Sequence, residues 1–176
     1  MTPAAGPFAI AAALLVAGGL LKTARPADTA TALRQSGLPA TPALVRAGGL
    51  VEAGLGVAAL VRGDRVTAVL VAVSYAAFAG FVALALRRGT PLASCGCFGK
   101  EDSPPTRQHV ALTAAAAAAA VAVAVQPGVG LAAVVRAQPL GGVPFLLLLC
   151  CGVAFAYLAL TSVPRLLVLV HGGGRS

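Results

Sequence analysis

Two cysteines separated by one glycine are the residues of this sequence best suited to chemistry. Cys95, Gly96 and Cys97 form the start of the string CGCFG, which lies in a connection rich in charge and proline. Two thiols this close can form a small disulfide ring, and the glycine relieves the backbone strain that the ring requires. A strained disulfide is easily reduced, so the pair suits disulfide exchange better than structural crosslinking.

Basic residues near the two thiols favour the same chemistry. Arg87 and Arg88 precede the pair and Lys100 follows it. Nearby cations lower the pKa of a thiol and so raise the fraction of reactive thiolate. The sequence therefore predicts a redox-active pair.

Two other interpretations of the CGC string remain. One is a tight glycine turn in which the cysteines are incidental. The other is a zinc site, with His109 and either Asp102 or Glu101 as the remaining ligands. Structural zinc sites usually combine two ligand pairs of similar spacing, and this sequence offers only one. We therefore expect no metal.

A carboxylate, Glu52, lies in the middle of an otherwise apolar stretch. A charge in hydrocarbon costs a few kcal/mol, so Glu52 should face the interior of a helix bundle, be paired, or be protonated. Arg46 is too far along the same helix for direct contact, and Lys22 on another helix is an alternative partner. Glu52 would then either handle protons or face a quinone, or it would form a buried hydrogen bond that fixes helix packing.

The composition excludes a soluble globular protein. The chain has 176 residues, of which 59% are hydrophobic and 10% charged, whereas soluble domains are about 25% charged. Disorder is excluded as well, because disordered chains are poor in hydrophobic residues. The net charge is +8, but the basic residues are scattered between apolar blocks. This arrangement suits contact with the headgroups of a lipid bilayer, and we expect no binding of nucleic acid.

The apolar blocks predict an all-α, polytopic transmembrane helix bundle. About 20 residues of helix cross the ~30 Å hydrocarbon layer. We expect four core spans and a fifth after a loop rich in proline and glycine, within a single domain of residues 1–170. The spans are 6–22, 43–61, 66–86, 109–126 and 143–163; residues 23–42 form a connection and residues 171–176 a disordered tail.

The distribution of positive charge gives an expected orientation. Basic residues cluster in the connections and ends that share a side with the CGC string, and cytoplasmic loops are enriched in Lys and Arg. This places the string in the cytoplasm. Maturation of exported disulfides would instead require thiols that can be reached from outside, so the side stays open. On the CGC side the count includes Lys22, Arg25, Arg34, Arg87, Arg88, Lys100, Arg107, Arg165 and Arg175; on the other it includes Arg62, Arg65 and Arg136.

Two further groups are expected to serve packing. Cys150 and Cys151 are adjacent in the fifth span, where they would point about 100° apart and not bridge. We expect them to be buried as small hydrophobic residues. Tyr75, Phe78 and Phe81 form an aromatic stripe along the third span, which is typical of core or lipid contact rather than a cofactor site.

The sequence resembles the MauE branch of the MauE/DoxX membrane proteins over residues 1–125. Arg87-Arg88-Gly89 followed by CGCFG is the most specific element of the resemblance. The first span ends in Gly19-Leu20-Leu21-Lys22, the second carries Leu50-Val51-Glu52 with Gly56, and Arg107 precedes the fourth, as in that family.

The resemblance implies a small helical membrane protein associated with thiol redox chemistry. It carries over Cys95 and Cys97 as the redox pair, and Lys22 and Glu52 as buried polar positions. In methylamine-utilisation clusters such proteins are linked to maturation of the disulfide-rich small subunit of methylamine dehydrogenase.

We therefore expect a multi-pass protein of the bacterial plasma membrane with thiol–disulfide oxidoreductase activity. The Cys pair would exchange electrons with a thioredoxin-like partner, a client protein or a quinone, and no cofactor would be bound. The alternative is a non-enzymatic assembly factor or scaffold in which CGCFG is a structural turn. A small-solute transporter using Glu52 is a third class, but the sequence lacks matching halves with broken helices.

Overall fold

The structure is a computed structural model that describes residues 3–88 and 106–162. Within these residues the chain is helical, without strands. The elements in chain order are α1 (Ala5–Ala24), α2 (Pro26–Gln35), α3 (Pro42–Arg62), α4 (Arg65–Arg88), α5 (Arg107–Val125), α6 (Leu131–Arg136), η2 (Pro139–Gly142) and α7 (Val143–Thr161). Five of the described helical segments are long and apolar enough to cross a membrane. They are α1, α3, α4, α5 and the segment Pro139–Thr161, which comprises η2 and α7. The predicted all-α polytopic bundle is confirmed.

The boundaries of the long helices follow from local sequence signals. α3 begins at Pro42. Proline is tolerated there because the first N–H groups of a helix have no acceptor within the helix, so the missing N–H costs no hydrogen bond. Thr41 caps this end, because its hydroxyl accepts a hydrogen bond from the backbone N–H of Leu44 at 3.2 Å. The helix ends where Gly63 adopts a left-handed conformation with φ of 60°. Each predicted span lies within two residues of the observed helix at both ends.

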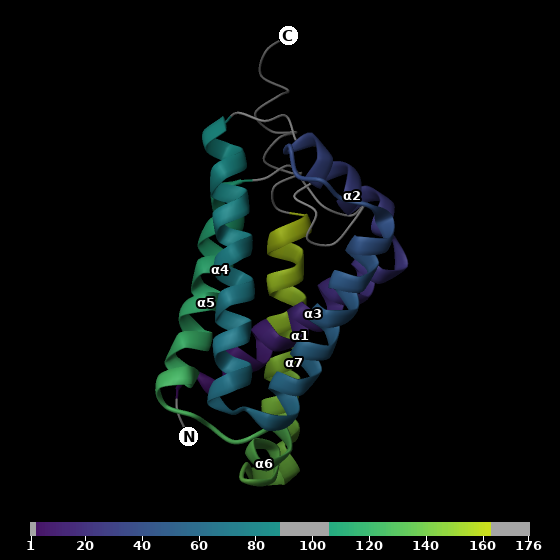
Figure 1. Cartoon of the computed structure of the whole chain (residues 1–176). Helices are drawn as coiled ribbons and strands as arrows, with labels where there is room; N and C mark the ends of the chain where they lie inside the picture. Colours follow the sequence, from purple (N-terminus) through teal and green to yellow (C-terminus); the bar gives the residue numbers. More distant parts are fainter. Residues whose placement is uncertain (1–2, 89–105, 163–176) are drawn as a thin grey trace.

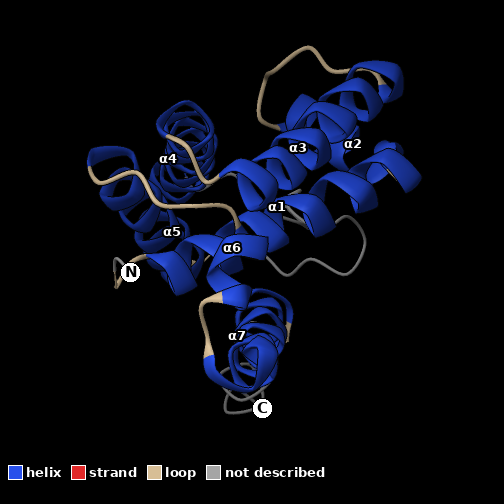
Figure 2. Ribbon diagram, turned by 90° about the horizontal axis from the view of Figure 1, so that it is seen from below, coloured by secondary structure: helices blue, strands red, loops and turns tan. Residues whose placement is uncertain are grey.

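The first helix occupies the middle of the bundle. α1 contacts α2, α3, α5 and α7, and α4 packs along α5. Seen from below in Figure 2, α1 crosses the centre, with α4 and α5 on the left, α2 and α3 at the upper right and α7 at the bottom. In Figure 1, α3 and α4 diverge upward from the turn that joins them. The two helices are farther apart at the end where α2 lies than at the turn.

Glycines bring α1 and α3 into close contact. A Cβ atom at Gly19 would lie 2.5 Å from the carbonyl oxygen of Gly49, and one at Gly49 would lie 2.6 Å from that of Gly19. Real side chains never approach so closely, so both positions need glycine. Small residues at a crossing of membrane helices let the backbones pack directly against each other.

Two short helices lie in segments that were predicted as connections or left unassigned. α2 occupies Pro26–Gln35 and buries Thr29 and Ala30, while Asp28 stabilises its first turn. Its polar residues hid it from a search for apolar spans. α6 follows the break after α5, and the predicted loop before the fifth span contains left-handed residues at Leu140, Gly141 and Gly142.

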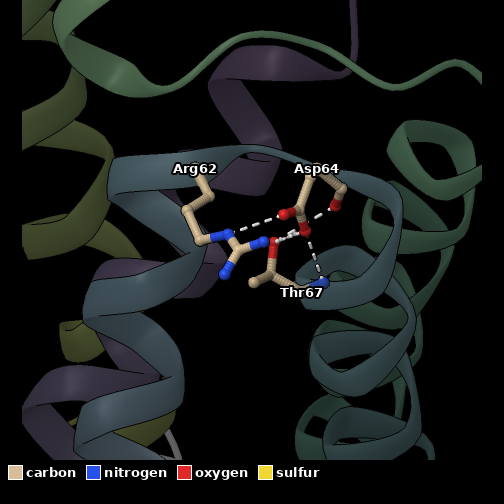
Figure 3. Close-up of polar contacts among 3 residues, drawn as sticks. All are labelled: Arg62, Asp64 and Thr67. Carbon is tan, nitrogen blue, oxygen red and sulfur yellow. Dashed lines mark hydrogen bonds and ion pairs between the residues drawn. The ribbon is translucent and has the colours of Figure 1, made fainter.

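A charged turn joins α3 to α4 (Figure 3). Oδ1 of Asp64 accepts a hydrogen bond from the backbone N–H of Thr67 at 2.9 Å, which caps α4, and Oδ2 lies 2.7 Å from Nε of Arg62. The Thr67 hydroxyl also lies 2.9 Å from Oδ1. The backbone N–H of Thr67, followed by its hydroxyl and by Arg62, holds the pKa of Asp64 below its ordinary value of 3.8.

Candidate functional site

An ion pair between α1 and α3 is the most distinctive polar feature of the described bundle. Nζ of Lys22 lies 2.7 Å from Oε2 of Glu52. The Lys22 side chain is 6% exposed and that of Glu52 is 25% exposed. The prediction that Glu52 is paired is confirmed, and of the partners considered it is Lys22 on another helix.

The close crossing of α1 and α3 positions this pair. Lys22 is in the last turn of α1, and Glu52 is at the centre of α3, about 15 Å from its start at 1.5 Å per residue. A Cβ atom at Gly49 would lie 3.1 Å from Cβ of Lys22, so the lysine leaves the backbone directly beside the glycine contact. The two charges therefore meet well inside the apolar length of α3.

One residue of the aromatic stripe on α4 contacts the lysine. Nζ of Lys22 lies 4.1 Å from the centroid of the Phe78 ring, which is close enough for a cation–π interaction. Tyr75 is buried and donates a hydrogen bond to the carbonyl of Ala11 at 2.7 Å. Tyr75 thus belongs to the core as predicted, whereas Phe78 and Phe81 also line a cavity.

That cavity, of about 770 Å³, lies beside the ion pair. Its walls come from α2, the α2–α3 connection, α3 and α4, and Lys22 contributes from α1. Pockets for organic ligands typically measure about 300–1,000 Å³. Gly48 on α3 and Ala77 on α4 line the cavity and are exposed, so it opens to the molecular surface between these helices. The lining is apolar except for Lys22, Glu52, Thr29 and Ser74.

The predicted redox pair lies outside the described residues. Cys95 and Cys97 belong to the segment between α4 and α5, and their role stays a prediction. Arg87 and Arg88, in the last turn of α4, are exposed, and so is Arg107 at the first position of α5. The three cations therefore flank the chain segment that carries the two thiols.

The histidine considered as a zinc ligand is buried in the first turn of α5. His109 is 1% exposed, and its Nδ1 lies 2.8 Å from the hydroxyl oxygen of Thr106. Among residues 3–88 and 106–162, no three His, Cys, Asp or Glu side chains gather as a metal site would need. The other ligands of the alternative zinc site lie outside the described residues.

The prediction that Cys150 and Cys151 are buried is wrong. Both are free thiols exposed on α7, where the buried residues are Leu160 and Thr161. In a helix surrounded by lipid the outward face is as apolar as the inward one, so hydrophobicity does not distinguish them. The two thiols face outward from the bundle.

Three cations counted for orientation have structural partners. On the CGC side, Arg34 donates to the carbonyl of Ala40 at 3.3 Å and Lys22 is paired with Glu52. On the other side, Nε of Arg65 donates to the carbonyl of Ala124 at 2.9 Å. Lys22 and Arg34 therefore have structural roles besides any effect on orientation.

Together, five membrane-length helices, two of them joined by a partly buried ion pair, define a multi-pass integral membrane protein associated with the lipid bilayer. The family described as methylamine utilisation protein MauE matches residues 2–126, and the chain belongs to this family. The match covers α1 to α5 and includes both members of the ion pair. Comparisons with curated proteins and with solved structures gave no match.

Proposed function

We propose that the protein is a membrane thiol–disulfide redox protein of the bacterial plasma membrane. The CGC string in the segment between α4 and α5 carries this proposal. Membership of a family named for methylamine utilisation supports it, and so do the exposed Arg87, Arg88 and Arg107 at the ends of that segment. The cations would favour the thiolate form of the cysteines.

The proposed reaction is a two-electron exchange. When Cys95 and Cys97 form their disulfide, two S–H bonds break, one S–S bond forms, and two electrons and two protons leave. A partner disulfide of a thioredoxin-like protein would take them up as a dithiol, or a quinone as a quinol. The reverse direction would begin when a thiolate attacks a disulfide sulfur and forms a mixed disulfide. The client would be an exported, disulfide-rich protein, as in methylamine utilisation.

Cysteine substitution in cells tests the proposal. Cys95→Ser and Cys97→Ser should each abolish function in a deletion strain while the protein still accumulates in the membrane. A Cys150→Ser/Cys151→Ser protein is the matched control and should complement fully, because those thiols lie on the outer face of α7. Full complementation by both single variants of the CGC string would contradict the proposal and favour the alternative of a non-enzymatic scaffold.

Thiol labelling then reports the redox state of Cys95 and Cys97 and the side of the membrane from which they can be reached. In the Cys150→Ser/Cys151→Ser background, only Cys95 and Cys97 remain as thiols. A membrane-impermeant maleimide that labels intact cells only after reduction would indicate an oxidised pair on the outside. Labelling that needs permeabilisation and no reductant would indicate free cytoplasmic thiols and contradict a role in exported disulfides.

A further inference from the structure

The cavity between α2, α3 and α4 combines three features that select one kind of ligand. It is large and apolar, it opens between two membrane-spanning helices, and it has the Lys22–Glu52 pair in its wall. A ligand that reaches it from the bilayer must itself be soluble in lipid. The groups in the wall then decide which lipid-soluble molecule fits.

The charges in the wall favour a neutral ligand that accepts hydrogen bonds. Lys22 and Glu52 cancel each other, so an anionic ligand would gain the attraction of the ammonium and suffer the repulsion of the carboxylate. The ammonium has three N–H donors. Glu52 accepts one of them, so a carbonyl oxygen of a ligand could accept another.

The aromatic residues favour a planar ring. Phe78 and Phe81 lie one turn apart on α4 and both line the cavity, and aromatic rings pack on each other in offset or edge-to-face arrangements. The Phe78 ring also contacts Nζ of Lys22, at 4.1 Å from the centroid. A ring with carbonyl substituents could meet the phenyl face and the ammonium together.

The carboxylate in the wall disfavours a phospholipid headgroup. Glu52 lies about 15 Å along α3 from Pro42, and its partner Lys22 lies in the last turn of α1. A phosphate beside Glu52 would be repelled, whereas an uncharged ring carries no such penalty and its apolar tail can lie between α3 and α4. We propose that the cavity is a binding site for a membrane quinone, with a ring carbonyl on Lys22 and the tail between α3 and α4.

This inference deepens the proposed function and rests on it for one point, the use of the bound quinone as electron acceptor. Two thiols and one quinone would yield one disulfide and one quinol, so that two electrons and two protons are transferred. Binding itself requires only the described residues of the cavity. The two ideas can therefore be tested apart.

Glycines on α3 provide a cavity-filling variant with a matched control. A Cβ atom at Gly48 or at Gly54 would meet nothing within 4 Å, and both positions are exposed on α3. Gly48 lines the cavity and Gly54 does not. Gly48→Leu should fill the site without disturbing the bundle, whereas Gly54→Leu makes the same change on another face. Ala77→Leu and its neighbour Ala76→Leu form a second such pair on α4, should the first not fold.

The experiment is equilibrium binding of a tritiated benzoquinone with a decyl tail. The full chain with Cys95→Ser and Cys97→Ser is placed in phosphatidylcholine nanodiscs, so that no electron transfer accompanies binding. We expect saturable binding that is weakened at least tenfold by Gly48→Leu and by Ala77→Leu, and left unchanged by Gly54→Leu and Ala76→Leu. Lys22→Met should weaken it severalfold through loss of the donor.

Three outcomes would overturn the quinone site. They are the absence of saturable binding, equal affinity of the cavity variants and their controls, and displacement of the probe by equimolar phosphatidylglycerol, which would assign the cavity to a lipid. Each leaves the proposed redox role of Cys95 and Cys97 intact, with a protein partner as acceptor. Loss of that role in the complementation assay would in turn leave the binding result unaffected.

Discussion

Lys22 and Glu52 are 30 residues apart in the sequence, yet their charged atoms lie 2.7 Å apart between α1 and α3. The crossing at Gly19 and Gly49 brings the two helices close enough for this contact. Within the apolar length of the bundle, the pairing lets two ionisable side chains occupy the wall of a cavity without an isolated charge.

Removal of one member of the pair should destabilise the protein more than removal of both. Lys22→Met leaves a carboxylate without its cation, and Glu52→Gln leaves an ammonium without its anion. We expect each to lower the free energy of unfolding by about 2–4 kcal/mol. The double variant should lose less than the sum, as measured by denaturant unfolding in detergent micelles.

The control for this cycle is a pair of exposed positions on the same helices. Leu20→Ala and Val51→Ala lie beside the ion-pair residues and face outward, so their effects should add. Additive effects of Lys22→Met and Glu52→Gln would contradict an energetic coupling between the two charges.

Two adjacent glycines on α3 should respond to alanine in opposite directions. A Cβ atom at Gly49 would lie 2.6 Å from the carbonyl of Gly19, whereas one at Gly48 meets open space. Gly49→Ala should destabilise the bundle by about 1–3 kcal/mol through overpacking. Gly48→Ala should stabilise it by up to about 1 kcal/mol, because alanine favours helix. Thermal unfolding of the two variants, compared with the wild type, measures both; equal shifts would mean that the close crossing is absent.

The cap of α4 should make a pH-dependent contribution to stability. The Asp64 carboxylate has a lowered pKa in the folded protein, so its contribution is complete above the ordinary value of 3.8. It is lost as the pH falls from there through the folded-state pKa, because protonation removes the charge that Thr67 and Arg62 stabilise. Asp64→Asn keeps an acceptor at the cap but does not titrate.

The measurement is the difference in melting temperature between wild type and Asp64→Asn as a function of pH. We expect the wild type to be the more stable at neutral pH and the advantage to shrink below pH 3.8. A difference that stays constant across the acidic range would show that the carboxylate charge does not stabilise the turn.

Substitution of the two cysteines of α7 should hardly change the free energy of unfolding. Cys150 and Cys151 are exposed, so Cys150→Ala and Cys151→Ala should each change the free energy of unfolding by less than about 0.5 kcal/mol. Leu160 on the same helix is buried, and Leu160→Ala should cost about 2–5 kcal/mol. A lipid-soluble maleimide should label the thiols and a charged one should not. A large loss of stability in either cysteine variant would place that side chain inside the bundle.

The long helices could be predicted from the sequence because each is an uninterrupted apolar run between prolines, glycines or charges. The partner of Glu52 could be anticipated for a related reason, since few charges lie within the spans to neutralise it. Burial on α7 could not be predicted, because Cys150 and Leu160 are both apolar and only packing tells the inner face from the lipid face. The helix over Pro26–Gln35 was missed because its polar outer face resembles a loop.

The cavity had no signature in the sequence. It depends on the angle at which α3 and α4 diverge from the turn around Asp64, and on the position of α2 across that gap. The exposed Gly48 and Ala77 look like ordinary small residues of membrane helices. Phe78 was recognised as part of a stripe, but its contact with Lys22 needed the three-dimensional arrangement.

The central place of α1 has a consequence for how the protein is made. Of the described helices, α1 leaves the ribosome before the others, yet in the finished bundle it contacts α2, α3, α5 and α7. During synthesis its small residues must therefore face lipid until later helices replace that lipid one by one. α3 is the next membrane-length helix to emerge, and it brings the anion for Lys22. Among the described helices, assembly thus proceeds outward from α1, and α7 is added after the others at the periphery.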